Sequence, residues 1–346
     1  LHIIDSLEPG GAEQVAITLA NIFQEKCHHV GLLYFNKTEV NLSEQISSGV
    51  DLLHFERRMK YNPLVSTELK YYVNKFDIMH IHLRYNLKYY SFLNFFHRFN
   101  KPVFFHDHFG NIERDKSIDF FEKYFMKSTV YICVSNILMN WANRNGLNKV
   151  FLLENIITRE KILNSNDYSN RIIIVGNIQK RKNQLFAIRL IKRIFLKKNV
   201  SLDIYGQILD YKYYRLLKNY IHNNNLENNV RFIFNCTQIQ KILHKYTLAI
   251  HCSTSETGPL VLLEYMAQGL PFLTNNTGQV IIHFKRDLPF FILNDFSIDH
   301  WLNAMELVQS KPQKKLREKM INIFNRICSP DIYYKKCLRI YTKNIP

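Results

Sequence analysis

The sequence predicts an α/β protein with two doubly wound domains, each built on a parallel sheet. Short apolar segments that suit strands alternate with segments of helical periodicity along the chain. The length of 346 residues is enough for two hydrophobic cores. A polar segment at 158–170 interrupts the alternation and has the composition of a linker. We therefore expect an N-terminal domain over 1–157 and a second domain over 158–329.

The first domain should hold a strand at its start, so the natural protein is expected to begin a few residues earlier. This strand leads through Gly10 and Gly11 into a helix with one apolar face. A final helical pattern occupies residues 330–346. The strands expected in the first domain are 1–4, 30–35, 52–55, 78–83, 103–106, 129–134 and 150–153. Those expected in the second domain are 172–176, 202–205, 230–234, 248–251 and 270–273.

Composition and charge restrict the class of protein. The chain is 47% apolar and 22% charged, which is typical of a globular protein, and it has no apolar run long enough to span a membrane. The formal charge of +17 suits an anionic partner such as a nucleoside diphosphate, an acidic lipid or a nucleic acid, and does not choose among them. The six cysteines lack the spacing of metal ligands and are expected to be buried thiols in a reducing compartment.

One stretch of the second domain carries a chemical signature. The strand at 248–251 leads into a loop with Glu256, and a Gly-Pro pair then opens a helix expected at 259–268. That helix contains Glu264 and should end at Gly269. The free N–H groups and the positive dipole end at its start favour an anionic ligand.

Two further loops follow strands and lead into helices. Gly10 and Gly11 suit a close approach to phosphate, and the alternative is a tight left-handed turn. Lys182 precedes a helix after the strand at 172–176, where its charge can meet a pyrophosphate. Arg181 and Lys180 are its basic neighbours.

The histidines and the aromatic residues of the first domain each allow two interpretations of their role. His80, His82, His106 and His108 suggest a metal site, but no Cys, Asp or Glu around them has ligand spacing, and we expect no metal. The segment 84–101 repeats aromatic residues at helical spacing between basic ones, which suits either a membrane surface or a core-facing helix with a solvated basic edge. The basic residues at 57–60 have the same two readings.

The stretch around Glu256 and Glu264 resembles the retaining, nucleotide-sugar-dependent glycosyltransferases of family 4. The carboxylate spacing, the apolar core of the helix, Gly269 and Pro271 all match that family's motif. The sequence departs from the family at Asn177, where arginine is usual, and at residues 277–279, which replace a Gly-Gly turn. A shift of the glycine to position 258 is a further departure.

The resemblance implies the GT-B fold, with two Rossmann-like domains facing a cleft and the helix at 330–346 crossing back to the first domain. It implies transfer of a hexosyl residue from a nucleotide diphosphate-sugar, with retention of configuration and without a metal or other cofactor. The implied acceptor is a glycan or a lipid-linked oligosaccharide in cell-surface polysaccharide synthesis, such as capsule or lipopolysaccharide. The implied location is the cytoplasm or the inner face of the cell membrane, with contact to anionic lipid and no nucleic-acid partner.

The same resemblance assigns the site residues. Glu256 is expected to contact the sugar hydroxyls of the donor, and Glu264 the ribose hydroxyls, because a carboxylate accepts two hydrogen bonds from a diol. The residues expected to act in catalysis are His106, Glu256 and Lys182. Those expected to bind the donor are Gly10, Gly11, Arg181, Lys182, Gly258, Leu260, Val261, Glu264 and Gly278.

Two other classes of function stay open at this point. A GT-B epimerase or phosphorylase would share the architecture, and donor hydrolysis measured with and without acceptor would separate it from a transferase. A non-catalytic basic protein would bind nucleic acid in a salt-dependent way, or bind a membrane, and would have no affinity for nucleoside diphosphates.

Overall fold

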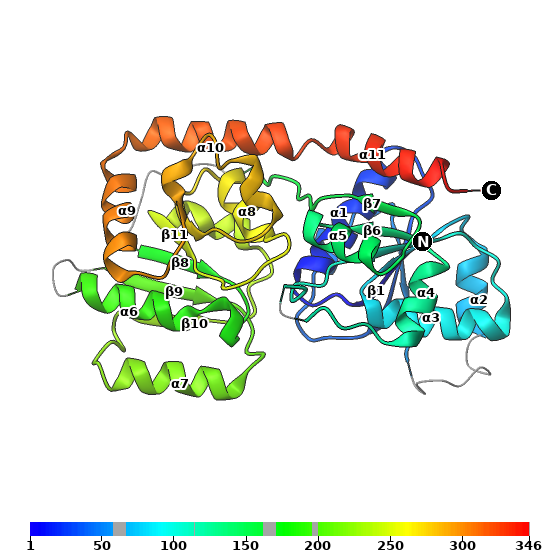
Figure 1. Ribbon diagram of the computed structural model, residues 1–346, viewed down its shortest axis with the longest axis horizontal. Helices are drawn as coiled ribbons and strands as arrows, with labels where there is room; N and C mark the ends of the chain where they lie inside the picture. Colours follow the sequence, from blue (N-terminus) through cyan, green and yellow to red (C-terminus); the bar gives the residue numbers. More distant parts are fainter. Residues whose placement is uncertain (58–66, 114, 162–170, 196–199, 346) are drawn as a thin grey trace. The chain divides into compact units, whose positions relative to one another are not determined.

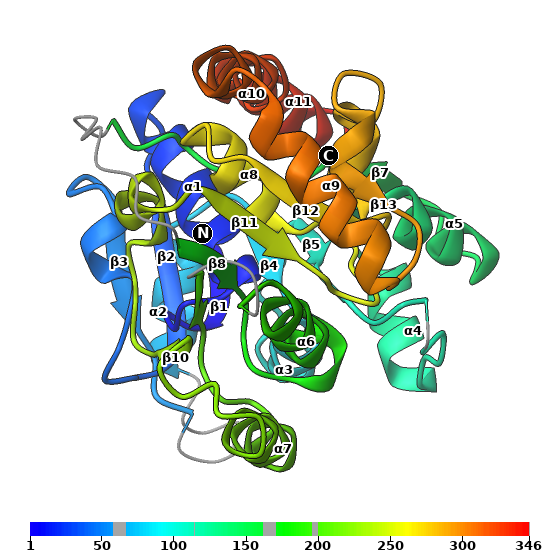
Figure 2. The same ribbon diagram turned by 90° about the vertical axis from the view of Figure 1, so that its left-hand side faces the viewer.

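The computed structural model forms two compact units, each described here by itself (Figures 1 and 2). The N-terminal unit consists of Leu1–Ile157 together with Ser329–Pro346, and the C-terminal unit is Thr158–Cys328. The residues that the structure describes are 1–57, 67–113, 115–161, 171–195 and 200–345.

The described residues of the N-terminal unit form a seven-stranded parallel sheet in the order β3-β2-β1-β4-β5-β6-β7. The central strands are largely buried, and polar side chains such as His2, His80 and His82 are buried in them beside the apolar ones. The strands are β1 (His2–Ser6), β2 (Gly31–Asn36), β3 (Asp51–His54), β4 (Met79–His82), β5 (Val103–Asp107), β6 (Val130–Cys133) and β7 (Val150–Leu152).

Helices cover this sheet. In α1 the predicted apolar face, which includes Val15 and Leu19, is buried. The expected C-terminal helix is α11, which begins where the Ser329 side chain accepts a hydrogen bond from the Ile332 N–H and which packs against α1 (Figure 1). The helices are α1 (Gly11–Glu25), η1 (Ser43–Gln45), α2 (Thr67–Asn74), α3 (Arg84–His97), α4 (Phe120–Lys127), α5 (Asn136–Arg144) and α11 (Pro330–Thr342).

The described part of the C-terminal unit forms a six-stranded parallel sheet in the order β10-β9-β8-β11-β12-β13. The last strand, which the sequence did not predict, has two residues and is too short to show a periodicity. The strands are β8 (Arg171–Val175), β9 (Ser201–Tyr205), β10 (Val230–Ile233), β11 (Leu248–His251), β12 (Phe272–Asn275) and β13 (Ile292–Leu293).

Helices also pack on this second sheet, and α10 lies against α8. The helix predicted at 259–268 is α8, and it begins one residue later than predicted because Pro259 has an extended backbone and occupies the capping position. The longer helices are α6 (Gln184–Phe195), α7 (Tyr211–His222), α8 (Leu260–Ala267), α9 (Ile298–Ser310) and α10 (Gln313–Ile327). The short turns are η3 (Lys180–Lys182), η4 (Ile239–Lys245), η5 (Gln279–His283) and η6 (Pro289–Phe291).

Both sheets have the strand order of a Rossmann-like domain, and the predicted fold class is confirmed. The order reverses between β1 and β4 in the N-terminal unit and between β8 and β11 in the C-terminal unit. Ligands of doubly wound sheets bind beyond the carboxyl ends of the strands at such a reversal. We therefore expect a ligand-binding site at the loops that follow these four strands.

Two smaller expectations can also be compared with the structure. Four of the six cysteines are buried, as expected: Cys133, Cys252, Cys328 and Cys337. The expectation is wrong for Cys27, which is exposed, and for Cys236, which is only partly buried. Among the described residues, no helix is both long enough and apolar enough to cross a membrane.

Candidate active site

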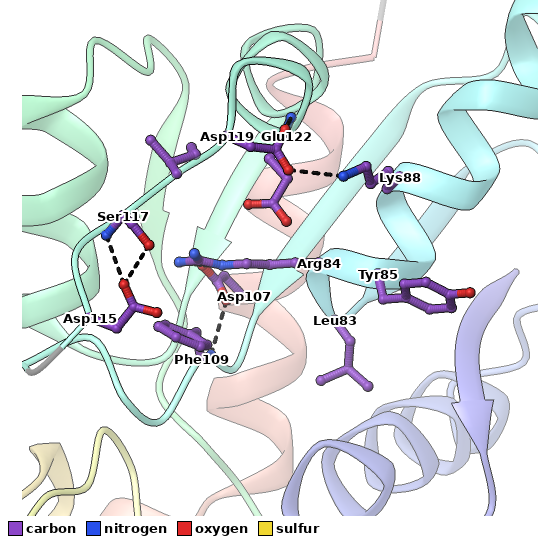
Figure 3. Close-up of a pocket in the computed structure, with 11 residues that line it drawn as sticks. Leu83, Arg84, Tyr85, Lys88, Asp107, Phe109, Asp115, Ser117, Asp119 and Glu122 are labelled. Carbon is purple, nitrogen blue, oxygen red and sulfur yellow. Dashed lines mark hydrogen bonds and ion pairs between the residues drawn. The ribbon is translucent and has the colours of Figure 1, made fainter.

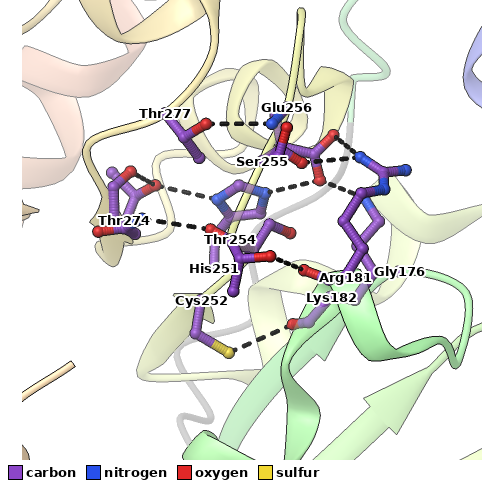
Figure 4. Close-up of polar contacts among 12 residues, drawn as sticks. Gly176, Arg181, Lys182, His251, Cys252, Thr254, Ser255, Glu256, Thr274 and Thr277 are labelled. Atoms are coloured by element: carbon purple, nitrogen blue, oxygen red, sulfur yellow. Dashed lines mark hydrogen bonds and ion pairs between the residues drawn. The ribbon is translucent and has the colours of Figure 1, made fainter. Parts of the chain in front are cut away.

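In the C-terminal unit, the loops after β8 and β11 bring a carboxylate and two cations together (Figure 4). The Glu256 carboxylate accepts hydrogen bonds from Lys182 Nζ at 2.6 Å and from Arg181 Nη1 at 2.9 Å. Arg181 also donates to the Ser255 carbonyl at 2.8 Å. Residues 181, 182 and 256, which the sequence analysis assigned to donor binding or catalysis, thus form one cluster.

The Glu256 carboxylate is held in its charged form. Burial by itself would raise its pKa, but the charge of Lys182, the contact with His251 and the charge of Arg181 outweigh burial and hold the pKa well below its ordinary value. The Lys182 and Arg181 side chains are 17% and 21% exposed, so a ligand can reach them. A negatively charged ligand at this point would compete with Glu256 for the two cations.

His251 is a member of this cluster that sequence reasoning missed. It is the last residue of β11, its Nδ1 lies 2.9 Å from Thr274 Oγ1, and its Nε2 lies 3.6 Å from Glu256 Oε1. The second distance is too long for a hydrogen bond and leaves an electrostatic contact. Burial lowers the His251 pKa, so the ring is neutral at pH 7. Sequence reasoning could have found His251 from its position at the carboxyl end of β11, a strand that adjoins the reversal of the strand order.

A second loop fixes the backbone of Glu256. The Glu256 N–H donates to Thr277 Oγ1 at 3.0 Å, and the Gln279 N–H donates to the Thr257 carbonyl at 2.7 Å. Gly278 lies between these two contacts with φ of +90°, and a Cβ there would lie 2.6 Å from Pro259 Cδ. Only glycine fits this backbone conformation and this close approach.

The start of α8 follows directly after this loop. Leu260 and Val261 are its first residues, and the first N–H groups of a helix have no partner within the helix. Glu264 lies further along α8, where burial, with the nearby charge of Glu160, raises its pKa to about 7. Glu264 therefore titrates near neutral pH, unlike Glu256.

Asn177 replaces the arginine that is usual in the family, and its side chain has a structural contact. Its Oδ1 accepts a hydrogen bond from the Gln207 N–H at 3.1 Å, which joins the loops after β8 and β9. Gly206 lies beside this contact, where a Cβ would lie 2.3 Å from the Gly176 carbonyl oxygen. Asn177 therefore supplies no positive charge, and the guanidinium that contacts Glu256 belongs to Arg181.

In the N-terminal unit, His106 lies at the end of β5 within a cluster of buried histidine rings. His80 and His82 share a face of β4, as the sequence predicted, and His2 of β1, which the sequence analysis did not consider, lies beside them. Burial lowers the pKa of each of these rings, so they are neutral at pH 7. His108 joins the cluster through a 3.1 Å contact with His82. The histidines form two groups of three, His2/His80/His82 and His82/His106/His108. Within each group, one ring nitrogen of each histidine lies within 4.8 Å of those of the other two.

Asp107, next to His106, orients its neighbours. Its carboxylate accepts hydrogen bonds from Arg84 at 2.8 and 3.0 Å and from the Tyr131 hydroxyl at 2.6 Å. The Phe109 N–H donates a fourth hydrogen bond at 3.0 Å. These bonds occupy the carboxylate and tie β5 to the start of α3.

A cavity of about 550 Å³ opens beside Asp107 (Figure 3). Arg84 and Asp107 form one wall, the Lys88–Asp119 ion pair another, and the aromatic rings of Tyr85 and Phe109 flank it in Figure 3. The residues that line it are Leu83, Arg84, Tyr85, Lys88, Asp107, Phe109, Asp115, Ser117, Ile118, Asp119 and Glu122.

At the start of α1, the glycines predicted to bind the donor have an ordinary backbone. Gly10 is extended, with φ of −151°, and caps the helix that Gly11 begins, so the left-handed turn considered as the alternative is wrong. Glu13 bends back toward Gly10, and burial raises its pKa to about 7. This second acid that titrates near neutral pH was not singled out from the sequence.

The aromatic segment at 84–101 divides between core and surface. Tyr89 and Phe99 are buried, as a core-facing helix requires, whereas Phe95 and Phe96 are exposed. On the neighbouring α4, which sequence reasoning did not consider, the exposed rings are Phe120, Phe121 and Tyr124.

The basic segment at 57–60 is described only at its first residue, since 58–60 lie outside the described residues. Arg57 is nearly buried, packs over the rings of Phe35, Tyr85 and Tyr89, and pairs with Asp5 at 3.2 Å. For Arg57, the membrane-surface reading is therefore wrong.

The chain thus consists of two Rossmann-like units, and in the C-terminal unit a carboxylate lies between two cations just before the start of α8. Residues 155–324 match the family described as "Glycosyl transferases group 1", and residues 9–161 match "Glycosyltransferase Family 4". The chain belongs to the family-4 type of glycosyltransferase. A search of curated proteins found no significant match.

Solved structures support the same fold. HepE of Anabaena in complex with UDP and glucose has a TM-score of 0.81 at 14% identity, with 99% of this chain and 98% of that one covered. A TarM variant of S. aureus, in complex with fondaparinux, α-GlcNAc-glycerol and UDP, has a TM-score of 0.77 at 13% identity, with 98% and 99% covered. Sucrose-phosphate synthase of Thermosynechococcus elongatus has a TM-score of 0.76 at 13% identity, with 99% and 98% covered.

Proposed function

We propose that this glycosyltransferase moves a hexosyl residue from a nucleoside diphosphate-sugar to a glycan or lipid-linked acceptor in cell-surface polysaccharide synthesis. The observation that carries the proposal is the cluster of Arg181, Lys182 and Glu256 at the start of α8. Two cations and the N–H groups of Leu260 and Val261 suit a diphosphate, on which negative charge develops as the sugar leaves. The UDP complexes of HepE and TarM support a UDP-sugar as the donor.

The same cluster supports transfer without a metal ion. Lys182 and Arg181 supply the positive charge that a divalent cation would otherwise bring to the leaving diphosphate. Activity should therefore persist in EDTA. Loss of activity in EDTA that returns with Mg²⁺ or Mn²⁺ would refute this part of the proposal.

We further propose that the configuration of the sugar is retained by attack from the same face. A carboxylate paired with two cations is a weak nucleophile, and Glu256 is paired in this way. Its role is then to accept hydrogen bonds from the sugar hydroxyls, while Glu264 accepts them from the ribose. The anomeric configuration of the product by NMR tests retention, and a sugar found covalently attached to Glu256 by mass spectrometry would overturn the mechanism.

The cavity beside Asp107 supports a place for the acceptor in the N-terminal unit. Sugar rings stack on aromatic faces and donate hydroxyl hydrogen bonds to carboxylates, and the cavity offers both kinds of group in Tyr85, Phe109 and Glu122. The Glu122→Gln variant should raise the acceptor KM and leave the donor KM unchanged. An unchanged acceptor KM would exclude Glu122 from the acceptor site.

The experiment that tests the donor assignment is a thermal-shift panel of UDP- and GDP-sugars. A ligand present at 100 times its Kd stabilises the folded state by about 2.7 kcal/mol, which is readily measured. Release of UDP with and without candidate acceptors then separates transfer from epimerisation or phosphorolysis. A protein that none of these nucleotides stabilises would contradict the proposal.

The exposed rings of α3 and α4 support contact with an anionic membrane. Phe95 and Phe120 are 79% and 78% exposed, and the chain carries a formal charge of +17, so aromatic insertion and attraction to acidic headgroups act together. The Phe120→Ser/Phe121→Ser/Tyr124→Ser variant should lose flotation with vesicles of phosphatidylglycerol and phosphatidylcholine. The matched control is Leu209→Ser, which removes a 61%-exposed apolar side chain from the C-terminal unit and should float as the wild type does. Equal flotation of the triple variant would refute the membrane contact.

A further inference from the structure

A chain of hydrogen bonds connects the C-terminal helix α11 to His106 in the N-terminal unit. The Tyr341 hydroxyl lies 2.5 Å from His80 Nδ1, and His80 Nε2 lies 3.1 Å from His106 Nδ1. All three side chains are buried. Tyr341 and His80 are 261 positions apart in the sequence, so only the folded unit brings them together.

Along this chain of hydrogen bonds, the position of one proton fixes the positions of the others. A neutral imidazole has one N–H donor and one acceptor nitrogen. Burial lowers the pKa of His80 and of His106 well below the ordinary value, so both rings are neutral. If the hydroxyl donates to His80 Nδ1, then His80 carries its proton on Nε2 and donates to His106 Nδ1. His106 must then carry its own proton on Nε2.

The direction of the chain follows from the acidity of its first member. A phenol is a stronger acid than a neutral imidazole and a weaker acceptor, so the hydroxyl donates and the ring accepts. Burial raises the pKa of Tyr341 well above its ordinary value, so the phenol keeps its proton at any working pH. We propose that Tyr341 and His80 are positioning residues that hold His106 in its Nε2–H tautomer, so that His106 offers the substrate a hydrogen-bond donor.

The far end of this chain of hydrogen bonds is the Nε2 atom of His106, which is buried. Among the described residues, none meets the buried His106 Nε2 in hydrogen-bond geometry. The Leu153 carbonyl lies near enough to the ring to favour its protonated form, which agrees with a proton on Nε2. An unsatisfied buried N–H is destabilising, and because His106 is fully buried, an oxygen of the bound substrate satisfies it only when the surroundings of the ring move. This last step rests on the proposed function, whereas the tautomer does not.

A metal ion shared by the same rings fits the geometry less well. The rings of His80 and His82 are stacked, with centroids 4.6 Å apart and planes 9° apart. Their lone pairs lie in the ring planes and point side by side, so they do not converge on one ion at the 2.0–2.1 Å that Zn²⁺ requires. His82 also has partners of its own, since Nε2 lies 3.2 Å from His2 Nδ1 and Nδ1 lies 3.1 Å from His108 Nε2. The nitrogens that would bind a metal thus already face other rings at hydrogen-bond distance.

The tautomer can be measured directly. Long-range ¹H–¹⁵N correlation spectra of protein labelled with ¹⁵N-histidine distinguish Nε2–H from Nδ1–H, and the His106→Gln variant assigns the signal. We expect a single Nε2–H form in the wild type and a mixture of tautomers in Tyr341→Phe, which removes only the hydroxyl. Tyr333→Phe, another buried tyrosine of α11, is the matched control and should leave the His106 signal unchanged.

Turnover gives a second readout. Loss of one hydrogen bond in the chain should lower kcat about three- to tenfold in Tyr341→Phe, with the donor KM changed by less than about twofold. His80→Gln keeps an acceptor and a donor at this position and should retain more activity than His80→Leu, even if both are less stable than the wild type.

Three results would overturn the inference. They are a wild-type His106 with its proton on Nδ1, a Tyr341→Phe spectrum identical to that of the wild type, and ring-nitrogen shifts that depend on added zinc or on EDTA. If instead no sugar is transferred but the tautomer changes as expected, the proposed function fails and the chain of hydrogen bonds stands.

Discussion

The Glu256→Gln variant tests the charge cluster of the C-terminal unit. In the wild type this carboxylate lies 2.6 Å from Lys182 Nζ and 2.9 Å from Arg181 Nη1. Glutamine keeps the shape but leaves two cations without their counter-charge. Breaking a buried ion pair costs about 3–5 kcal/mol, and we expect about 2–3 kcal/mol here because both cations are partly exposed. For a unit of this size, that lowers Tm by about 4–12 °C.

A nucleotide should reverse much of this loss. The diphosphate of UDP supplies negative charge to Lys182 and Arg181, and in the variant it has no carboxylate to displace. UDP lacks the sugar, so it isolates this effect from any contact between Glu256 and sugar hydroxyls. We therefore expect UDP to raise the Tm of Glu256→Gln by several degrees more than it raises that of the wild type.

The pH dependence of the effect has a definite sign. Because the Glu256 pKa is lowered in the folded state, its contribution to stability is present above the unfolded value of about 4.3 and is lost as the pH falls through the folded value. The difference in Tm between the wild type and the variant should thus stay constant from pH 6 to 8 and shrink in strong acid.

Differential scanning fluorimetry with and without saturating UDP measures all of these quantities. Glu227→Gln, at an exposed ion pair with His222 in the same unit, is the control and should leave Tm unchanged. A ligand-free Glu256→Gln protein as stable as the wild type, or one that UDP stabilises less, would refute the reasoning.

Three further variants test neighbouring parts of the site. Lys182→Met should lower kcat/KM for the donor by about 10²–10³-fold, because a charge beside the leaving diphosphate is lost. Lys180→Met, on an exposed side chain of the same turn, is the control and should leave kcat/KM near the wild-type value. Equal losses in the two variants would show that only the overall charge matters. Glu264 has its pKa raised from 4.5 to about 7, so its contribution to stability should fall as the pH rises between these values, and UDP should bind more tightly as the carboxylate ionises through pH 7. The stability of the wild type relative to Glu264→Gln should show this fall, because the difference cancels the titration of Glu13 and of the buried histidines. A pH dependence of UDP binding that survives the substitution would assign it to another group. Gly278→Ala combines φ of +90° with a Cβ 2.6 Å from Pro259 Cδ, and it should lower both Tm and donor affinity. Gly146→Ala, with φ of +74° in open space, is the control and should lower Tm by a smaller amount and leave donor affinity unchanged. Similar effects of the two substitutions would show that backbone strain is the whole cause.

Local patterns were enough to predict most of the fold. Strand and helix periodicities repeat every two and every 3.6 residues, so short windows of sequence identify them, and the alternation of the two implies parallel sheets. The segment from β11 through α8 was predicted almost residue by residue because a Gly-Pro pair and Gly269 mark its ends. The two-residue strand β13 was missed because it is shorter than any such window.

Contacts between distant residues lay beyond these windows. Arg181 and Glu256 are 75 positions apart, and they meet because the sheet places β8 beside β11. The contact of Tyr341 with His80 and the burial of Arg57 under aromatic rings have the same origin. Periodicity reports which face of an element is apolar, but it carries no information about the element on the other side.

The sequence by itself therefore determined the class of fold, the family and the residue types that carry charge. The tertiary structure decided which charges pair, which of them stay reachable by a ligand, and which acids titrate near neutral pH. Pairing and burial are properties of the surroundings of a group, and strand order rather than position in the chain sets those surroundings. That is why Glu256 and Glu264, eight positions apart in one motif, have pKa values shifted in opposite directions.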